Sequence, residues 1–292
     1  MAPCPGTIAL IAALAARGPA AAPPASPPPT VPGYVLTMET RAIAPAVKTL
    51  DAAAPEARAL MESVRGPASL KSRVWIAQDL SRQEILSTDF VLPAGTIVLH
   101  KAGDKFYVIA DPRARTYLVM DSEQLLNALE GGAGIVNSQY TAKVTPTDEK
   151  KLVAGVPCRK SILTVSYVSA IPFENDRMMV QQKNEMEVWH TFDIVSPAAF
   201  DHFFFKFQRD KTGTVQKLLA TELGFPMEVS LIVTQGTGRR AGAAQPGSLH
   251  AQVVEVKKEK ELDSELLRIP PAGYRRVEKS PYFKDGAAVR IP

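Results

Sequence analysis

Cys158 is the residue with the widest choice of chemistry, because a thiol can act as a nucleophile, bind a soft metal or form a disulfide. It stands where a predicted strand begins, in the stretch "KLVAGVPCRKSILTVSYV" that ends a polar loop. A nucleophilic thiolate needs a neighbouring base or a helix N-terminus. Strand alternation points Arg159 to the other face, and no histidine is near in the sequence. We therefore predict a small, half-buried strand residue without a catalytic role.

The histidines and the glycine-rich loop show no spacing that is typical of a metal or phosphate site. No two histidines are four residues apart, no HExxH occurs, and we expect each to be a surface group of a strand or helix. The stretch "GTGRRAG" lacks the following helix whose amides would bind a phosphate. We predict no metal ion and no cofactor. The four histidines are His100, His190, His202 and His250.

The stretch "FDHFFFKF" is the least ordinary feature of the sequence. At about 100° per residue, four of its phenylalanines share one helix face, and Phe205 points elsewhere. This face either packs against a sheet as ordinary core or lines a cavity for an apolar ligand, with methionines near it as pliable lining. The candidate ligand-binding residues are Phe200, Phe203, Phe204, Phe207 and Trp189.

Period-two patterns separated by Pro, Gly and Asp predict about ten strands between residue 33 and the end of the chain. Their short connections require antiparallel hairpins. Several strands, such as "FYVIA" and "YLVM", are apolar on both faces, which indicates that both faces are covered. We expect a mainly β (α+β) domain: a strongly curved antiparallel sheet or unclosed barrel with helices packed in its concave face. Helices are predicted within 47–65 after Pro55, and over about 121–130, 197–212 and 214–223.

Composition and charge are those of an ordinary soluble globular protein. The chain has 292 residues, 46% hydrophobic and 22% charged, with a net charge of +4. Lysines and arginines are interspersed with carboxylates and do not gather in an aromatic-laced stripe, so nucleic acid is not an expected partner.

The first 32 residues are predicted to be a signal peptide and a disordered linker. A short apolar run, residues 8–16, is followed by small residues and then by a Pro/Ala/Ser tract. Removal of the signal would remove Cys4 and leave Cys158 as a single thiol. A disordered Ala/Pro-rich tail is the alternative reading. The remainder, 33–292, is expected to be one domain with a helical insertion near 42–68 and a C-terminal tail from 279.

Five short motifs, in this order, give the chain a resemblance to a known family. They are Asp111-Pro112 with Tyr117, Gly155-x-Pro157-Cys158, Trp189 with Asp193, Gly224-Phe225-Pro226, and Pro271-Ala272-Gly273-Tyr274. Over residues 33–278 the chain resembles a bacterial cell-envelope domain related to the LolA-type lipoprotein carriers. The resemblance implies an incomplete antiparallel barrel with helices on its concave side and a hydrophobic cavity between them.

The resulting expectation is a periplasmic or secreted, non-enzymatic protein that binds an apolar chain, either a lipid or a lipoprotein acyl group. An envelope protein and peripheral contact with a membrane are the other expected partners. The rival from another class is a structural or partner-docking protein without a small ligand. An enzyme would require a histidine, Cys158 and a carboxylate to converge in space.

Overall fold

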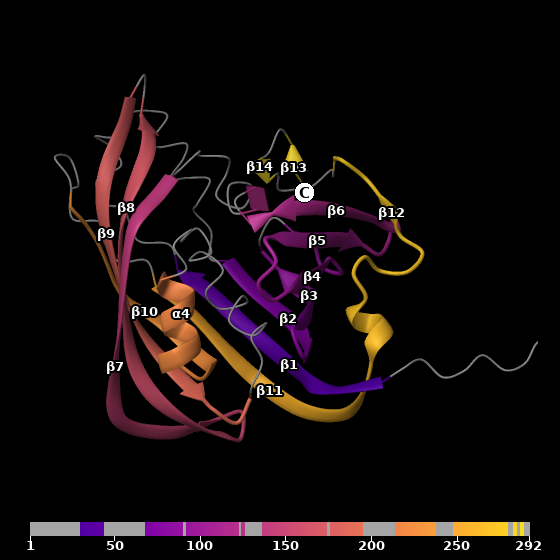
Figure 1. Ribbon diagram of the computed structural model, residues 1–292, viewed down its shortest axis with the longest axis horizontal. Coiled ribbons are helices and arrows are strands. Elements are labelled where there is room, and N and C mark those ends of the chain that lie inside the picture. The colour runs from indigo at the N-terminus through magenta and orange to yellow at the C-terminus, as the bar shows by residue number, and fades with distance from the viewer. Residues whose placement is uncertain are drawn as a thin grey trace, which may run out of the picture.

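Most strands of this protein belong to one large sheet, shown in Figure 1, a computed structural model. The residues that it describes are 30–43, 68–89, 92–122, 124–125, 136–173, 176–194, 214–237, 248–279, 283–284 and 287–288.

Twelve strands belong to this sheet, and a separate pair, β13 and β14, lies near the end of the chain. One α-helix, α4 (Thr214–Glu222), and one 3-10 helix, η4 (Ser264–Leu267), are described in full. The strands are β1 (Thr30–Ile43), β2 (Ala68–Ala77), β3 (Leu80–Thr88), β4 (Ile97–Lys101), β5 (Phe106–Asp111), β6 (Thr116–Asp121), β7 (Val136–Val153), β8 (Val156–Phe173), β9 (Asp176–Thr191), β10 (Phe225–Thr237), β11 (Ser248–Asp263), β12 (Arg275–Arg276), β13 (Phe283–Lys284) and β14 (Ala287–Ala288).

The sheet order is β12-β6-β5-β4-β3-β2-β1-β11-β10-β9-β8-β7, and all neighbours are antiparallel except β12 and β6. The predicted mainly β class with an unclosed, antiparallel sheet is confirmed. Although β10 and β11 are the last long strands of the chain, they are not at an edge of the sheet. Both strands lie in its middle, because β11 pairs with β1 along nearly the whole of both strands.

The β7–β8 hairpin shows how turn chemistry sets register. Ala154 and Gly155 both have positive φ, 49° and 79°, as a two-residue turn of this type requires. The turn places Lys151 opposite Cys158. We expected a polar loop before Cys158, but this stretch is the end of β7. A register shift between β7 and β8 follows Pro146.

Paired residues project from the same face of a sheet, so the register sorts side chains onto two faces. One, which we call the Leu36 face, carries apolar side chains on at least nine strands, with polar positions such as Ser81 between apolar ones. Its apolar side chains are Leu36 and Met38 (β1), Val74 and Ile76 (β2), Val98 (β4), Tyr107 and Ile109 (β5), Leu118 and Met120 (β6), Leu163 and Val165 (β8), Met186 and Val188 (β9), Val229 (β10) and Val253 (β11).

The opposite face, which we call the Glu39 face, carries ion pairs. They are Lys71–Glu39 (3.0 Å), Arg82–Glu84 (3.6 Å), Lys151–Glu228 (2.7 Å), Lys160–Glu187 (3.0 Å), Lys183–Glu185 (3.8 Å) and Lys257–Glu255 (3.3 Å).

The C-terminal segment covers the Glu39 face where β4, β5 and β6 are apolar on both sides. Leu267 packs with Ala77 and Leu262, and Tyr274 packs against a cluster that contains Leu99. We expected helices as the only cover of such strands. That expectation is wrong for this face, because residues 264–277, a 3-10 turn and a short strand, supply the cover.

Helix α4 packs on the Leu36 face and confirms the helix predicted over 214–223. Val215, Leu219 and Leu223 recur at helical spacing and are buried in one cluster with Val188 and Leu163. Figure 1 shows α4 beside β7 and β10.

The other predicted helices lie wholly or mostly outside the described residues. Residues 47–65 and 197–212 are outside them, and only four residues of 121–130 are inside. The strands on either side of the predicted insertion, β1 and β2, pair directly with each other. β1 begins at Thr30, within the last three residues of the predicted linker.

Both edges of the sheet are protected from pairing with another chain. β7 contains Pro146, a register shift and several lysines, which are features that blunt an exposed edge. At the other edge, β12 covers β6, with the Val277 amide donating to the Tyr117 carbonyl oxygen at 2.9 Å.

A substitution of Gly33 tests how closely β1 and β2 approach each other. A Cβ at this position would lie 2.5 Å from the carbonyl oxygen of Ile76, a backbone atom that cannot move away cheaply. We expect Gly33→Ala to lower the free energy of unfolding by about 2 kcal/mol, measured by urea denaturation. Arg41→Ala, an exposed position of the same strand, should change it by less than about 0.5 kcal/mol. Equal effects of the two substitutions would contradict this account.

Candidate functional site

Trp189 is the one predicted ligand-binding residue that the structure describes, and it lies on the Glu39 face. Its neighbour Val188 points to the opposite side, into the cluster that contains α4. Trp189 is buried in a different cluster, which contains Cys158 and Val153 and also, from β1 and β2, Leu36 and Val74. The predicted phenylalanine stripe, residues 200–207, lies outside the described residues.

Lysines from the β7–β8 hairpin cover the Trp189 ring. The Lys151 ammonium is 4.2 Å from the ring centroid and the Lys160 ammonium 5.8 Å. A cation over an indole face is attracted by its quadrupole, and the interaction strengthens where water is excluded. The surroundings of Trp189 are therefore those of a cation–π site.

Carboxylates complete this cluster. Lys151 binds Glu228 at 2.7 Å, and Glu228 is also 3.4 Å from His250. Lys160 binds both Glu187 and Glu149 at 3.0 Å, and these hydrogen bonds raise the pKa of the Lys160 ammonium. Each lysine that contacts the ring thus has an anionic partner.

Cys158 lies beneath this cluster and is 3% exposed. Its Sγ donates to the Val156 carbonyl oxygen at 3.3 Å. Burial raises the pKa of the thiol to about 11, although the ammonium of Lys151 acts in the opposite direction. The thiol therefore stays protonated at neutral pH, which agrees with the predicted packing role and does not favour a nucleophile.

His190 joins three elements from the other face of β9. The Gly224 amide donates to His190 Nδ1 at 3.1 Å, and His190 Nε2 is 3.0 Å from Ser161 Oγ. Gly224 must be glycine, because a Cβ there would meet the Thr191 carbonyl oxygen. The histidine thus ties the C-terminal end of α4 to β9 and β8.

This arrangement also fixes the tautomer of His190. Nδ1 accepts from an amide, so the ring proton is on Nε2, which donates to Ser161. A general base for Ser161 would need an unprotonated Nε2. The Ser161–His190 pair is therefore arranged as a structural joint, and Cys158 lies on the opposite face of the two strands.

Two of the four histidines differ from the expected surface position. His100 and His190 are both buried. His100 stacks on Tyr107 with ring centroids 4.1 Å apart, and its Nε2 is 2.8 Å from the Asp104 carbonyl oxygen. Within the described ranges, no group of three or more His, Cys, Asp or Glu side chains is placed to bind a metal ion.

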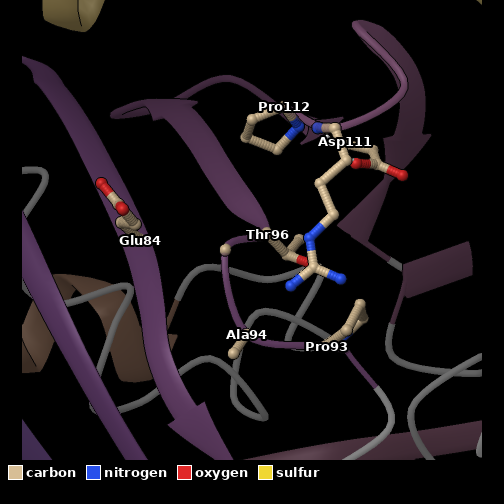
Figure 2. A pocket seen from close by; sticks show the side chains of 8 residues that line it. Glu84, Pro93, Ala94, Thr96, Asp111 and Pro112 are labelled. Carbon is tan, nitrogen blue, oxygen red and sulfur yellow. Dashed lines mark hydrogen bonds between the residues drawn. The ribbon is translucent and has the colours of Figure 1, made fainter.

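A small pocket with both polar and apolar lining lies between the β3–β4 connection and the β5–β6 turn. Its volume is about 130 Å³. Figure 2 shows Glu84 on one side and Asp111 with Pro112 on the other, above Pro93 and Ala94. Asp111 is already engaged, since its Oδ1 accepts from the Arg113 and Ala114 amides. This pocket is too small for an acyl chain.

Sequence reasoning missed the lysines that cover Trp189 and the exposed residues Leu152 and Phe192. The two-residue turn at Ala154–Gly155 was a usable indication, because it fixes Lys151 opposite Cys158. Phe192 had no comparable indication, since the strand ends just before it.

The thiol of Cys158 should react slowly in the folded protein. In a Cys4→Ala background, we expect modification by a disulfide reagent at neutral pH to be at least about a hundredfold slower than in denaturant, because both access and thiolate fraction are low. Absorbance of the released thiol checks this, with Cys158→Ser as the blank. Equal rates in the two conditions would refute the buried, protonated thiol.

His190 should make stability depend on pH. Burial, and then the charge of Arg159, lower the pKa of the imidazole below its usual value near 6.5. Below about pH 6.5 the unfolded state therefore binds more protons than the folded state. The free energy of unfolding decreases as the pH is lowered, until the pH is below the folded-state pKa of His190.

His190→Asn supplies the comparison, because its side-chain oxygen can accept from the Gly224 amide without titrating. Denaturant unfolding between about pH 5 and pH 7.5 should show a smaller slope for this variant. Superimposable slopes would show that His190 does not titrate differently on folding.

No protein-family model and no curated protein matches this chain. Among solved structures it is similar to an uncharacterised conserved protein from Thermus thermophilus, with 10% sequence identity and a TM-score of 0.36. The match covers 86% of this chain and 91% of that chain. A likeness of this strength assigns neither family nor function.

Proposed function

We propose that the protein is a non-enzymatic, LolA-like binding protein of the cell envelope. It would act in the periplasm after removal of the signal peptide and hold an apolar chain, a lipid or lipoprotein acyl group. The chain would lie between the Leu36 face and helices packed on the concave side of the sheet.

The observation that carries the proposal is the separation of the two faces. Apolar side chains continue along the Leu36 face from β6 to β8, whereas the ion pairs occupy the Glu39 face. The apolar side chains of the Glu39 face, such as Leu99 and Trp189, are already buried there. A sheet of this kind offers a broad apolar surface to whatever packs on it. Each Å² of apolar surface removed from water contributes about 25 cal/mol before the costs of association are subtracted.

The position of α4 supports a helix as the cover of this surface. Val215 and Leu219 bury against strands β7 to β10, and the helix reaches the joint at Gly224. The predicted stripe of Phe200, Phe203, Phe204 and Phe207 precedes α4 in the chain and would extend the same cover.

A second candidate is a structural or partner-docking role without a small ligand. Complete burial of Leu36, Val74, Ile76, Leu163 and Val253 favours it, because these side chains already have packing partners. In this case the phenylalanine face is ordinary core.

A fluorescent fatty acid separates the two candidates. Carriage predicts saturable binding of the probe to the purified protein, displaced by unlabelled fatty acid. Phe203→Ser should weaken binding by about tenfold or more, since a phenyl group leaves the lining. Phe205→Ser, off the predicted stripe, is the matched control and should change it little. Fluorescence titration gives both affinities.

Native mass spectrometry and lipid extraction of protein from a periplasmic fraction provide the independent readout. An apolar chain that co-purifies supports carriage. Absence of both a bound chain and saturable probe binding would leave the docking role as the proposed function.

A further inference from the structure

An exposed apolar patch lies at one end of the sheet, where the β7–β8 hairpin turns and β9 ends. Leu152 is 69% exposed and Phe192 58% exposed. Pro157, also exposed, pairs with Leu152 across the turn. We call Leu152, Pro157 and Phe192 the hairpin-tip patch.

The three side chains project from the same side of the strands. Lys150 pairs with Arg159, and Arg159 pairs with His190, so these positions share a face with Leu152 and Pro157, two residues away along their strands. The His190 and Phe192 rings are in edge contact, with centroids 5.4 Å apart. Figure 1 shows the β7–β8 turn at the lower end of the sheet.

Positive charge adjoins the patch on this side. Lys150 and Arg159 are both exposed, and by register both project with the patch. Of the carboxylates near the tip, Glu149 binds Lys160 on the opposite face. The tip therefore presents apolar side chains next to cations.

We propose that the hairpin-tip patch docks the protein on a bilayer that contains anionic lipids. Leu152 and Phe192 enter the boundary between headgroups and acyl chains, while Lys150 and Arg159 pair with lipid phosphates. Two large apolar side chains at a protruding turn offer far less area than the roughly 800 Å² per partner of a stable protein interface. A bilayer can bind so small an apolar area, because it does not need a complementary surface. The charged side chains around Leu152 and Phe192 contact mobile lipid headgroups.

Docking extends the proposed function by naming a membrane as partner, but it does not require carriage. If the protein binds the fatty acid but not the vesicles, docking alone is overturned. If it binds the vesicles but not the fatty acid, carriage alone is overturned.

The test is co-sedimentation of the full chain with two kinds of vesicle, phosphatidylcholine alone and phosphatidylcholine mixed with phosphatidylglycerol. We expect binding to the mixed vesicles that weakens as salt is added. The double variant Leu152→Ser/Phe192→Ser should bind at least about tenfold more weakly. Lys150→Gln and Arg159→Gln should each cost about fivefold.

Phe106→Ser is the matched control. Phe106 is 44% exposed and has the Lys105 ammonium 5.0 Å from its ring, so it is also an apolar side chain beside a cation. It belongs to β5, and its substitution should leave vesicle binding unchanged. All variants keep residues 1–29, so any binding by the apolar run cancels in the comparison.

Three outcomes would overturn the proposal: equal binding to both kinds of vesicle, equal loss in Phe106→Ser, or no binding at all. A dimer in solution that the double variant dissociates would instead make the patch an interface between copies and would also overturn it. Thermal unfolding verifies that the double variant is folded, which is expected because both side chains are exposed.

Discussion

The two halves of the sheet are joined at a narrow seam. In the part of the chain that the structure describes, β10 and β11 pair at only three positions, Glu228 to Ser230 with Gln252 to His250. By contrast, β11 pairs with β1 at thirteen positions and β8 with β9 at fifteen. Every strand from β7 to β10 is connected to the rest of the sheet through this short ladder.

Side-chain contacts also join the two parts of the sheet. The contact of His250 with Glu228 crosses it, and the Tyr34 hydroxyl donates to the Asp193 carbonyl oxygen at 3.2 Å from β1. One buried cluster also contains residues of both halves, including Val253 and Met227. The register shift between Pro226 and Glu228 provides the bend that lets this cluster form, because a bulge turns the strand out of the plane of its neighbours. The Trp189 cluster therefore has a mechanical role beside the seam.

Local sequence patterns predicted the parts of this fold that depend on neighbours in the chain. The helix α4 and the packing of Cys158 follow from helical spacing and alternation. The pairing of β1 with β11 could not be predicted in this way, since two strands far apart in sequence carry no shared local pattern. The burial of His190 was missed for the same reason: its partner is the backbone of Gly224 in another element. Of the candidate site, alternation separated Trp189 from Val188, but only the three-dimensional register placed lysines over the ring.

The partnership of β1 with β11 has a consequence for the order in which the protein forms. The Thr37 hydroxyl bonds Glu255 across 218 residues of chain, and β12 and Tyr274 come later still. β1 must therefore wait, unpaired on one side, until the 218 residues that separate Thr37 from Glu255 have been made. Closing so large a loop is slow, because its entropy is lost before the contacts that compensate for it are made. During synthesis, the incomplete chain would expose an apolar ribbon, and chaperones that shield such ribbons are the cellular factors on which its yield should depend.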